Sequence, residues 1–383
     1  MANLKIAIAS CGLRHIRRGI ESWADDLALA LHRVGADVTL FQGSATGAVE
    51  TWQRTLPCWR RFEPATARIL SVTGKLGGWR YGFGNEYEIE QSSFALPLWK
   101  AIRRDYDILH VQDPWIARLL DGLNRKGLSR PRVIIGHGTE EPDSLLRKYR
   151  YLQHLAPVYR EQFEHVKAQG QLSFAVPNFV DTDRFRPGDR QTARAAWGIP
   201  EEALVILSAA ALKKHHKRGD YLIREFAGFR KTFGPRALLI MAGAREGETA
   251  ELIQLGASVL GDSLRVLESV DRAKLPSLYQ AADIFALASL HEMMPIVTLE
   301  ALSCGLPLSC NSTPVLNWIT GPAGFPEDLS VPGGLTRQWE RLSDSALRAS
   351  VSLHARAHAV RTFSETVVLA QIEQMYASVM RDK

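Results

Sequence analysis

The sequence predicts an α/β protein built from two doubly wound parallel sheets in tandem. The chain has 383 residues, more than one hydrophobic core usually serves, so two domains of about 180 residues each are expected. Short apolar runs rich in β-formers alternate with amphipathic stretches along the whole chain, which is typical of parallel sheets. The hydrophobic fraction of 46% and charged fraction of 23% exclude disordered, collagen-like and disulfide-scaffold classes.

Ten runs are predicted to be strands. In the first half they are Lys5–Ala9, Asp37–Phe41, Ile108–Gln112, Arg132–Gly136 and Leu172–Val176. In the second half they are Leu204–Ala209, Ala237–Ala242, Leu264–Leu267, Asp283–Ala286 and Pro307–Cys310. The polar segment 177–190 contains two prolines and a glycine and is predicted to link the halves. We therefore expect domains at 1–185 and 186–363, and a C-terminal helix within 364–383 that packs back on the first domain.

The positive charge of the chain is concentrated in its first half. Residues 1–188 carry 26 Lys and Arg against 20 Asp and Glu, whereas residues 189–383 carry 21 of each, so the surplus is +6 and zero. A basic surface attracts anionic lipid, nucleic acid or a phosphorylated substrate, and a merely solvated surface is an equal alternative. We expect no nucleic-acid partner. Two possibilities remain open: peripheral membrane contact through the first domain, and an anionic or lipid-linked molecule as the acceptor if the protein transfers a chemical group.

The sequence indicates a cytoplasmic protein. No apolar run approaches the roughly 18 to 20 residues that span a bilayer, and the first ten residues lead into a strand pattern rather than a signal peptide. The four cysteines, Cys11, Cys58, Cys304 and Cys310, form no CxxC pair or zinc-site spacing. We expect reduced and mostly buried thiols.

The region Gly43–Trp99 breaks the regular alternation of strand and helix. It is rich in Trp, Arg and Gly, and long irregular insertions in compact domains tend to be functional or mobile. Two interpretations remain open at this stage: an acceptor-binding surface, or a loosely packed excursion whose aromatic side chains bury themselves.

The strongest motif is the segment 289–307, SLHEMMPIVTLEALSCGLP, which follows a predicted strand. Pro295 suits the first position of a helix, where free backbone N–H groups attract a pyrophosphate. Carboxylates accept paired hydrogen bonds from the hydroxyl groups of sugars. Glu292 precedes this helix, at the end where such a sugar is expected, and Glu300 lies about 7 to 8 Å further along the axis at ~1.5 Å per residue, which matches the span from a phosphate to a ribose. The residues expected to form this phosphate-binding helix start are Met294, Pro295, Ile296 and Val297.

A second motif is the segment 207–224, LSAAALKKHHKRGDYLIR, in which a strand passes into a helix through a basic turn. A cation about 4 Å from a phosphate oxygen contributes up to ~4 kcal/mol at an effective dielectric of 20. That charge matters most where negative charge grows on a leaving group. A solvated basic helix start is disfavoured because positive charge there opposes the helix dipole. The candidate phosphate-binding residues are Lys213, Lys214, Lys217 and Arg218.

The segment with the two glutamates resembles the E-x7-E motif of retaining glycosyltransferases of family 4, which have the GT-B fold. VPNFVDTDRFRP is similar to the inter-domain segment of that family, RVIIGHGTEE to its first-domain strand ending in His-Gly, and YQAADIFALAS to the strand before the motif. The resemblance implies two Rossmann-like domains facing a central cleft, with the C-terminal helix crossing back to the first. It also implies an acceptor-binding first domain and a second domain that binds a UDP- or GDP-sugar.

The resemblance carries over to particular residues of the basic turn. Lys217 falls on the family lysine that stabilises the departing nucleotide diphosphate. Ala211 stands where the family has an arginine, so Lys213 or Lys214 is expected to supply the second charge. Met294 lies in a Met-Met-Pro sequence that replaces the common Gly-Phe-Gly of the family.

Two residues of the first domain are further candidates. His137, in a Gly-His-Gly turn, matches the family histidine beside the donor sugar, although an isolated histidine at a strand end is more often structural. Gly19 precedes a helix predicted to start near Ile20 and would let the backbone approach the donor phosphates, although such a glycine is also an ordinary cap. His110 is interpreted as a core histidine.

No metal ion or cofactor is expected. The pairs Asp105/Asp107 and Asp181/Asp183 mimic the metal-binding DxD motif of another glycosyltransferase fold. The first pair lies at a helix-to-strand junction and the second in the linker, and neither faces a second donor-binding element. Lysines and a helix N-terminus are able to neutralise the pyrophosphate instead.

The sequence therefore predicts a retaining, metal-independent hexosyltransferase that acts on a hydroxyl acceptor in glycan, glycolipid, glycoconjugate or polysaccharide biosynthesis. A nucleotide-sugar epimerase of the same fold is an alternative. A non-catalytic nucleotide-sugar-binding partner subunit is another, because Ala211 departs from the family pattern. A nicotinamide dehydrogenase is the weakest alternative, since no GxGxxG follows the first strand.

Overall fold

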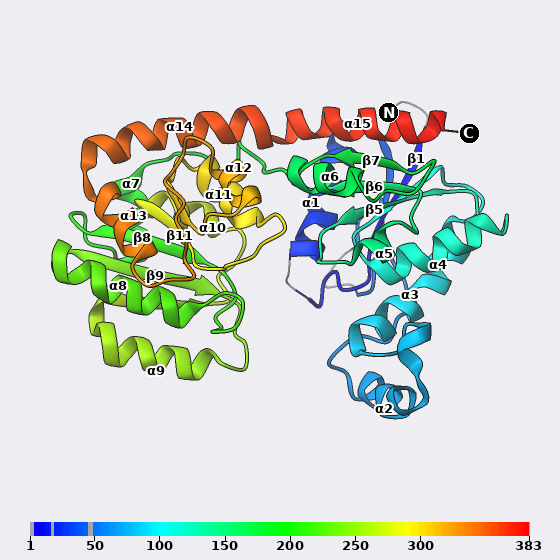
Figure 1. Ribbon diagram of the computed structural model, residues 1–383, viewed down its shortest axis with the longest axis horizontal. Coiled ribbons are helices and arrows are strands. Elements are labelled where there is room, and N and C mark those ends of the chain that lie inside the picture. The colour runs from blue at the N-terminus through cyan, green and yellow to red at the C-terminus, as the bar shows by residue number, and fades with distance from the viewer. Residues whose placement is uncertain (1–3, 17–18, 45–48, 383) are drawn as a thin grey trace. The chain divides into compact units, whose positions relative to one another are not determined.

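The computed structural model describes residues 4–16, 19–44 and 49–382, and the chain divides into two compact units (Figure 1). The first unit comprises Met1–Pro177 together with Leu369–Lys383, and the second comprises Asn178–Val368. Each unit contains a parallel β-sheet and is described separately below.

The sheet of the first unit has seven strands among the described residues, in the order β3-β2-β1-β4-β5-β6-β7. They are β1 (Lys5–Ser10), β2 (Asp37–Gln42), β3 (Gln53–Thr55), β4 (Ile108–Val111), β5 (Arg132–His137), β6 (Tyr151–His154) and β7 (Leu172–Ala175). The central strands are nearly continuous apolar runs that are buried on both faces, as expected for a parallel sheet covered by helices. The strand order reverses direction between β1 and β4, so this unit is doubly wound.

Helices of the first unit follow most of its strands. They are α1 (Gly19–Arg33), α2 (Pro64–Thr73), α3 (Glu86–Ile102), α4 (Pro114–Arg125), α5 (Asp143–Leu146) and α6 (Pro157–Glu164), with the short 3-10 helices η1 (Gly74–Leu76) and η2 (Gly78–Tyr81). Phe41 of the sheet and Phe94 and Leu98 of α3 belong to one fully buried apolar cluster. This cluster fixes α3 against the sheet.

The last helix, α15 (Glu365–Arg381), begins in the second unit, and its residues from Leu369 onward belong to the first. Its apolar stripe at Ile372, Met375 and Val379 is almost fully buried. The Tyr376 hydroxyl lies 2.9 Å from Nδ1 of His110, a core residue of β4. The C-terminal helix therefore packs on the first domain, as the sequence predicts.

The sheet of the second unit has five parallel strands among the described residues, in the order β10-β9-β8-β11-β12. They are β8 (Leu204–Ala209), β9 (Ala237–Gly243), β10 (Leu264–Glu268), β11 (Ile284–Leu287) and β12 (Leu308–Cys310). The order reverses between β8 and β11. The two predicted doubly wound sheets are thus confirmed, and each of the ten predicted strands lies within one residue of an observed one.

The helices of the second unit cover both faces of this sheet. They are α7 (Arg190–Trp197), α8 (Gly219–Phe233), α9 (Thr249–Leu260), α10 (Leu275–Ala281), α11 (Ile296–Ser303), α12 (Pro314–Thr320), α13 (Gly334–Ser343) and α14 (Ser345–Phe363), with the 3-10 helix η3 (Gly261–Ser263). Phe226 and Phe229 of α8 contact the indole ring of Trp339 edge to face, with ring centroids 6.1 and 5.9 Å apart. These rings form the centre of the second core.

The boundary between the units lies earlier than the predicted position at residue 186. Asn178 already belongs to the second unit, where its Nδ2 donates to the Met294 carbonyl at 3.0 Å. Val180 forms a β-bridge with Ser364. These contacts join the linker to the second unit. The second boundary lies at Leu369 rather than at residue 364, because helix α15 is continuous across it.

The region Gly43–Trp99 is more regular than its sequence suggests. It contains strand β3 and helices α2 and α3 as well as two 3-10 helices. The Asn85 side chain caps α3 by accepting from the Glu88 N–H at 2.9 Å, which is a common helix start. The pattern was obscured by Pro97 inside α3 and by the many glycines before it.

No helix among the described residues combines the length and the apolar character needed to cross a membrane.

Replacing Tyr376 with Phe should destabilise the first unit by about 1 to 3 kcal/mol, because the buried His110 Nδ1 loses its hydrogen-bond partner. The other ring nitrogen, Nε2, lies 2.6 Å from Oε1 of Gln153, so Nδ1 is the acceptor for the tyrosine hydroxyl. Urea unfolding measures the change. Tyr81→Phe, at an exposed tyrosine, serves as the matched control, and equal stability of the two variants would contradict the prediction.

Candidate functional site

The candidate site lies where strands β8 and β11 are neighbours in the second sheet. The two strands are parallel, with Ile206 opposite Ile284 and Leu207 opposite Phe285. From this point, β9 and β10 are added on one side of the sheet and β12 on the other. In open parallel sheets, ligands bind outside the carboxyl ends of the strands at such a reversal. The two loops that leave these ends carry both sequence motifs.

Helix α11 begins one residue later than predicted. Pro295 is the N-cap, with extended backbone angles of φ −71° and ψ 113°, and Ile296 is the first helical residue. The predicted first-turn position of Pro295 is therefore wrong. The Pro295 carbonyl accepts from both the backbone N–H and the hydroxyl of Thr298, at 3.1 and 2.6 Å. The N–H groups of Ile296 and Val297 have no acceptor within the helix, which suits them to an anion.

Two asparagines that the sequence analysis missed hold the loop before α11. Asn178 donates to the Met294 carbonyl at 3.0 Å, and Asn311 donates to the Leu290 carbonyl at 2.8 Å. The other amide atom of Asn311, Oδ1, accepts from the Leu329 N–H at 2.8 Å. Asn311 directly follows strand β12, and Asn178 lies three residues after the end of β7. This position after a strand was the signal that the sequence offered for them. They fix the path of the loop that carries Glu292.

Lys217 and Glu292 meet across the strand reversal. The Lys217 ammonium forms an ion pair with Oε1 of Glu292, which lies 75 residues further along the chain. Their side chains are 20% and 9% exposed, so the pair is largely shielded and still reachable from solvent. This contact places a cation beside a carboxylate that can accept sugar hydroxyl groups.

The basic turn has an unusual backbone. His216 and Arg218 adopt positive φ angles of 66° and 50°, which are uncommon for residues with a side chain and cluster at functional sites. A Cβ atom on Gly219 would lie 2.7 Å from the Leu252 side chain. Glycine at this helix start therefore allows α8 to pack closely against the Leu252 side chain of α9.

The four basic candidates of this turn point to different partners. Lys214 pairs with Glu251 of α9, and its N–H donates to Glu248 at 2.9 Å. The Arg218 guanidinium donates to the Leu329 carbonyl at 2.7 Å and lies 3.9 Å from the centre of the Tyr221 ring. Lys217 and Lys213 are the two lysines of this turn whose charges act on His216.

His216 lies among these charges and was given no role from the sequence. Burial lowers its pKa, and the positive charges of Lys217 and Lys213 lower it further, while Glu292 acts in the opposite direction. Its imidazole is therefore neutral at physiological pH. It adds a polar group between the basic turn and the loop of Glu292 without adding charge.

Glu300 is buried in α11, with only 5% of its surface exposed. Its Oε2 accepts from the Tyr279 hydroxyl of α10 at 2.7 Å. Burial and the nearby carboxylate raise the pKa of Tyr279 well above its ordinary value, so the hydroxyl stays protonated and donates. Glu300 is therefore a buried, hydrogen-bonded carboxylate rather than a solvated one.

The remaining candidates belong to the first unit. His137 ends strand β5, and its Nδ1 lies 3.4 Å from Nδ1 of His154 at the end of β6. Burial lowers the pKa of His137 to about 4 and that of His154 to about 3, so both rings are neutral. Gly19 is the exposed first residue of α1, and a Cβ atom there would meet nothing within 4 Å. The local packing does not require glycine at that position.

The strand reversal of the first unit, between β1 and β4, has a different character. Arg61 donates to Glu90 at 2.6 Å and to Glu21 at 3.1 Å, and all three side chains are buried. Asp113 accepts from the Cys11 N–H at 3.3 Å, and burial raises the pKa of its carboxyl to about 6. The side chains at this reversal are thus mostly acidic, which disfavours a diphosphate.

The two aspartate pairs have structural partners. The Asp181 side chain accepts from the N–H groups of Asp183 and Arg184, at 3.1 and 2.9 Å. Asp107 accepts from the Lys5 N–H at 2.9 Å and pairs with Arg130 at 2.8 Å. No group of three or more His, Cys, Asp or Glu side chains in the described ranges is arranged to hold a metal ion.

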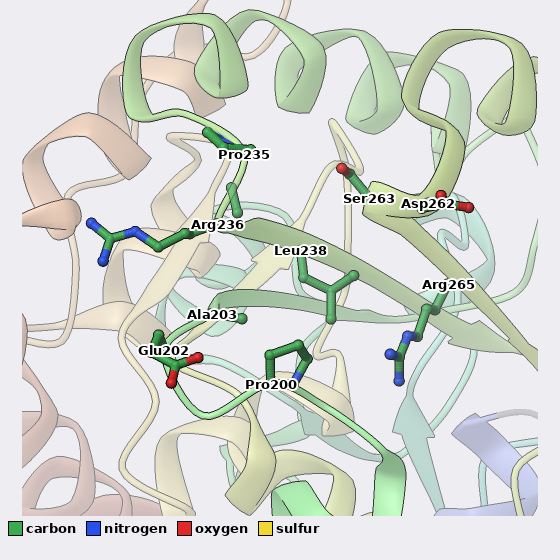
Figure 2. Close-up of a pocket in the computed structure, with 10 residues that line it drawn as sticks. Pro200, Glu202, Ala203, Pro235, Arg236, Leu238, Asp262, Ser263 and Arg265 are labelled. Carbon is green, nitrogen blue, oxygen red and sulfur yellow. The ribbon is translucent and has the colours of Figure 1, made fainter.

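A surface hollow of about 270 Å³ lies at the opposite edge of the second sheet (Figure 2). Its lining includes Ala203, Arg236 and Ser263, which directly precede strands β8, β9 and β10 in that order. Figure 2 shows Arg236 and Arg265 on opposite sides of it. The Arg265 guanidinium donates hydrogen bonds to the Trp197 and Gly198 carbonyls, at 2.8 and 2.7 Å. This hollow contains none of the candidate residues.

Comparison with known proteins finds a family match within the second unit. Residues 189–319 match the family model described as "Glycosyl transferases group 1". The matched range contains the basic turn, both glutamates and helix α11. This match agrees with the predicted resemblance for this part of the chain.

Several curated relatives are similar over part of the chain. It is 34% identical over 198 residues to D-inositol 3-phosphate glycosyltransferase of Saccharomonospora viridis, covering 48% of this chain and 44% of the relative. It is 32% identical over 189 residues to the Mycobacterium leprae protein of the same name, covering 46% and 41%. The match therefore spans less than half the length of these relatives.

Solved structures of the same fold cover nearly the whole chain. Sucrose-phosphate synthase from Thermosynechococcus elongatus has a TM-score of 0.75 at 15% identity, covering 99% of this chain and 100% of the other. Anabaena HepE in complex with UDP-glucose has a TM-score of 0.70 at 16% identity, covering 98% and 100%. The fold is therefore GT-B, as the sequence predicts.

The free energy of unfolding should decrease as the pH falls below about 6.5, the pKa of an unfolded histidine. The buried histidines are neutral in the folded protein and bind protons on unfolding. The pKa of His154 is about 3 when folded and about 6.5 when unfolded. The contribution of His154 to the free energy of unfolding is complete above pH ~6.5. It is lost as the pH falls towards the pKa of the folded state, by up to about 1.4 kcal/mol per pH unit.

His154→Gln should therefore flatten the dependence of unfolding free energy on pH between about pH 7 and 5, measured in urea. The comparison between variants is the readout, because the raised pKa of Asp113 acts in the opposite direction. His354→Gln, at an exposed histidine, is the control. An unchanged slope in His154→Gln would refute the assignment.

Proposed function

We propose that this chain is a retaining glycosyltransferase of family 4 that transfers a sugar from a nucleotide diphosphate sugar to a hydroxyl group. The observation that supports this proposal most directly is the contact between Lys217 and Glu292 at the strand reversal of the segment that matches glycosyl transferases group 1. It joins a cation for the leaving diphosphate to an acceptor for sugar hydroxyl groups.

In the proposed donor complex, the pyrophosphate lies against the first turn of α11 and the basic turn. The backbone N–H groups of Ile296 and Val297 donate to its oxygens, and Lys217 and Lys213 supply positive charge. Glu292 accepts hydroxyl groups of the sugar. Glu300, oriented by Tyr279, accepts those of the ribose. UDP- and GDP-sugars both suit this arrangement, and the UDP-glucose complex of HepE makes UDP-glucose the first donor to test.

The reaction that we propose exchanges one bond at the anomeric carbon for another. The bond from this carbon to the β-phosphate oxygen breaks, and its electron pair leaves with the diphosphate. The acceptor oxygen forms the new bond on the same face of the sugar, so the configuration is retained, and its proton passes to the departing phosphate. Lys217 stabilises the charge that grows on the leaving group. No carboxylate acts as a nucleophile.

We assign His137 to the donor sugar as a neutral hydrogen-bonding group. Its lowered pKa, about 4, means that it carries no charge at physiological pH. A neutral imidazole offers one donor and one acceptor to hydroxyl groups, which suits a sugar better than a phosphate. Gly19 remains a proposed point of backbone approach to the donor.

The proposed acceptor is a hydroxyl group of a glycan, a lipid-linked sugar or a small molecule. The names of similar proteins include D-inositol 3-phosphate glycosyltransferase and sucrose-phosphate synthase, so phosphorylated polyols and sugars belong in an acceptor panel. We place the reaction in the cytoplasm. Its reducing conditions suit four cysteines that are all free thiols.

We also propose that no metal ion takes part, since lysines and a helix N-terminus supply the positive charge.

The experiment that tests the function measures sugar transfer and donor binding together. Thermal shift against a panel of nucleotide sugars identifies the donor, because a ligand at 100 times its dissociation constant adds about 2.7 kcal/mol of stability. Transfer is then measured with and without a chelator, and NMR of the product reports the anomeric configuration.

The outcomes separate the alternatives. Isomerised nucleotide sugar without any acceptor would identify an epimerase, and tight donor binding without turnover would identify a non-catalytic subunit. Ala211, which stands in place of the family arginine, keeps the second alternative open. Loss of transfer in the presence of a chelator would contradict the metal-independent mechanism.

Lys217→Ala should lower the rate of transfer by about 10² to 10³, as expected for removing one group that stabilises charge in the transition state. Lys231→Ala, which removes an exposed lysine from the last turn of α8, is the matched control and should transfer at the normal rate. Steady-state kinetics at saturating donor provide the measurement. A normal rate in Lys217→Ala would reject the assignment.

Lys213 rather than Lys214 should supply the second positive charge. Lys213→Ala should weaken transfer about tenfold or more, since a hydrogen bond to a charged group contributes about 1.5 to 3 kcal/mol. Lys214→Ala should have little effect, because its ammonium pairs with Glu251. The ratio of kcat/KM values between the two variants decides the matter, and a larger loss in Lys214→Ala would reverse the assignment.

A further inference from the structure

The first unit carries a protruding segment whose chemistry the proposed transfer reaction does not use. We call residues 59–81 the arm; it contains α2, η1 and η2. Figure 1 shows α2 within the first unit, beyond α3 and away from the sheet. The arm lies in the region whose function the sequence left open.

The arm exposes more large apolar side chains than any comparable part of the described chain. Among the described residues, every Trp, Tyr and Phe side chain that is 47% or more exposed lies in the arm. The apolar side chains concerned are Trp59, Phe62, Val72, Leu76, Trp79 and Tyr81, with exposures from 47% to 78%. Exposed apolar side chains that are concentrated in one segment in this way point to an interaction site.

The exposed apolar surface is accompanied by positive charge. The arm contains five Lys and Arg residues and one Glu. Arg61 points inward to its buried glutamates, and Arg60 pairs with Glu63 at 3.5 Å. Three exposed basic residues remain, Arg68, Lys75 and Arg80.

The basic and apolar side chains are interleaved. Arg68, Val72 and Leu76 follow one another at four-residue spacing, which places them along one side of α2 and its continuation. The Arg80 guanidinium lies 5.0 Å from the centre of the Trp79 ring, so one site combines a cation with an amphipathic ring. Helical segments that lie in the surface of a membrane have this composition, with aromatic and aliphatic side chains beside Lys and Arg.

The exposure of the arm does not result from loose packing. At its base, Arg61 donates to Glu90 at 2.6 Å and lies 4.2 Å from the centre of the Tyr87 ring. The Trp59 N–H donates to the Ser93 hydroxyl at 2.9 Å. These bonds hold the arm on α3 while its outer side chains remain in solvent. The interpretation as an excursion whose aromatics bury themselves is therefore wrong.

We propose that the arm is a docking surface for an anionic lipid membrane. Its three exposed cations complement negative headgroups, and Leu76, Trp79 and Tyr81 enter the region between headgroups and acyl chains. This inference is independent of the proposed transfer reaction. Lipid is favoured over a protein partner for two reasons. The apolar side chains alternate with exposed charges that are all positive, and they include Trp and Tyr, the two aromatic types that are enriched at membrane interfaces.

The test uses the full-length protein in co-sedimentation with vesicles. The vesicles contain either phosphatidylcholine alone or an equal mixture of phosphatidylcholine and phosphatidylglycerol. We expect binding to the mixed vesicles that weakens as salt is added, and about tenfold less or no binding to phosphatidylcholine alone. Equal binding to both compositions, or binding to neither, would overturn the proposal.

Two variants separate the charge from the apolar contribution. The triple variant Arg68→Ala, Lys75→Ala and Arg80→Ala should lose at least about tenfold in affinity for the mixed vesicles. The double variant Leu76→Ser and Trp79→Ser should lose a similar amount. Leu353→Ser, which removes a leucine of α14 that is 75% exposed, is the matched control and should bind normally. Thermal unfolding of each variant verifies that it is folded.

A second copy of the chain is the competing occupant. Sedimentation velocity without lipid measures it directly: a dimer that the Leu76→Ser and Trp79→Ser variant abolishes would overturn the proposal. Donor-induced thermal shifts should be the same in the arm variants as in the unmodified protein. Failure of vesicle binding is thereby distinguishable from failure of the proposed transfer function.

Discussion

The parallel pairing of β8 with β11 is the constraint on which the candidate site depends. Because these strands are neighbours in the sheet but not in the sequence, their carboxyl ends bring Lys217 and Glu292 together across 75 residues. The surrounding groups serve this contact. Asn178 and Asn311 fix the loop of Glu292, and the packing of α8 against α9 fixes the turn of Lys217.

The two units use one topology with opposite electrostatics. Both sheets reverse their strand order once, and both reversals hold charged side chains. In the second unit, a lysine lies near the start of α11, whose first N–H groups have no acceptor within the helix. In the first unit, Arg61 is enclosed by Glu21 and Glu90, with Asp113 close by. The same topology thus presents a reversal that attracts an anion in the second unit and a mostly acidic reversal that disfavours one in the first.

The sequence predicted the sheets well because β-strands that are buried on both faces leave continuous apolar runs. It missed β3, which is short and polar, and β6, whose four buried residues include a glutamine and a histidine. Of the candidate site, it identified the charged side chains but not their partners. The engagement of Lys214 with Glu251 and the support from Asn178 depend on segments distant in the chain, and no local pattern encodes them.

Helix α15 has a consequence for the synthesis of this protein. A ribosome releases the β1–β7 portion long before it makes Ile372, Met375 and Tyr376, yet these residues complete the core of that portion. Part of the apolar surface of the first unit therefore stays uncovered until Leu369 and the residues after it have been made, whereas the residues of the second unit all precede them in the chain. The core of the first unit is thus the later of the two to have all of its residues available.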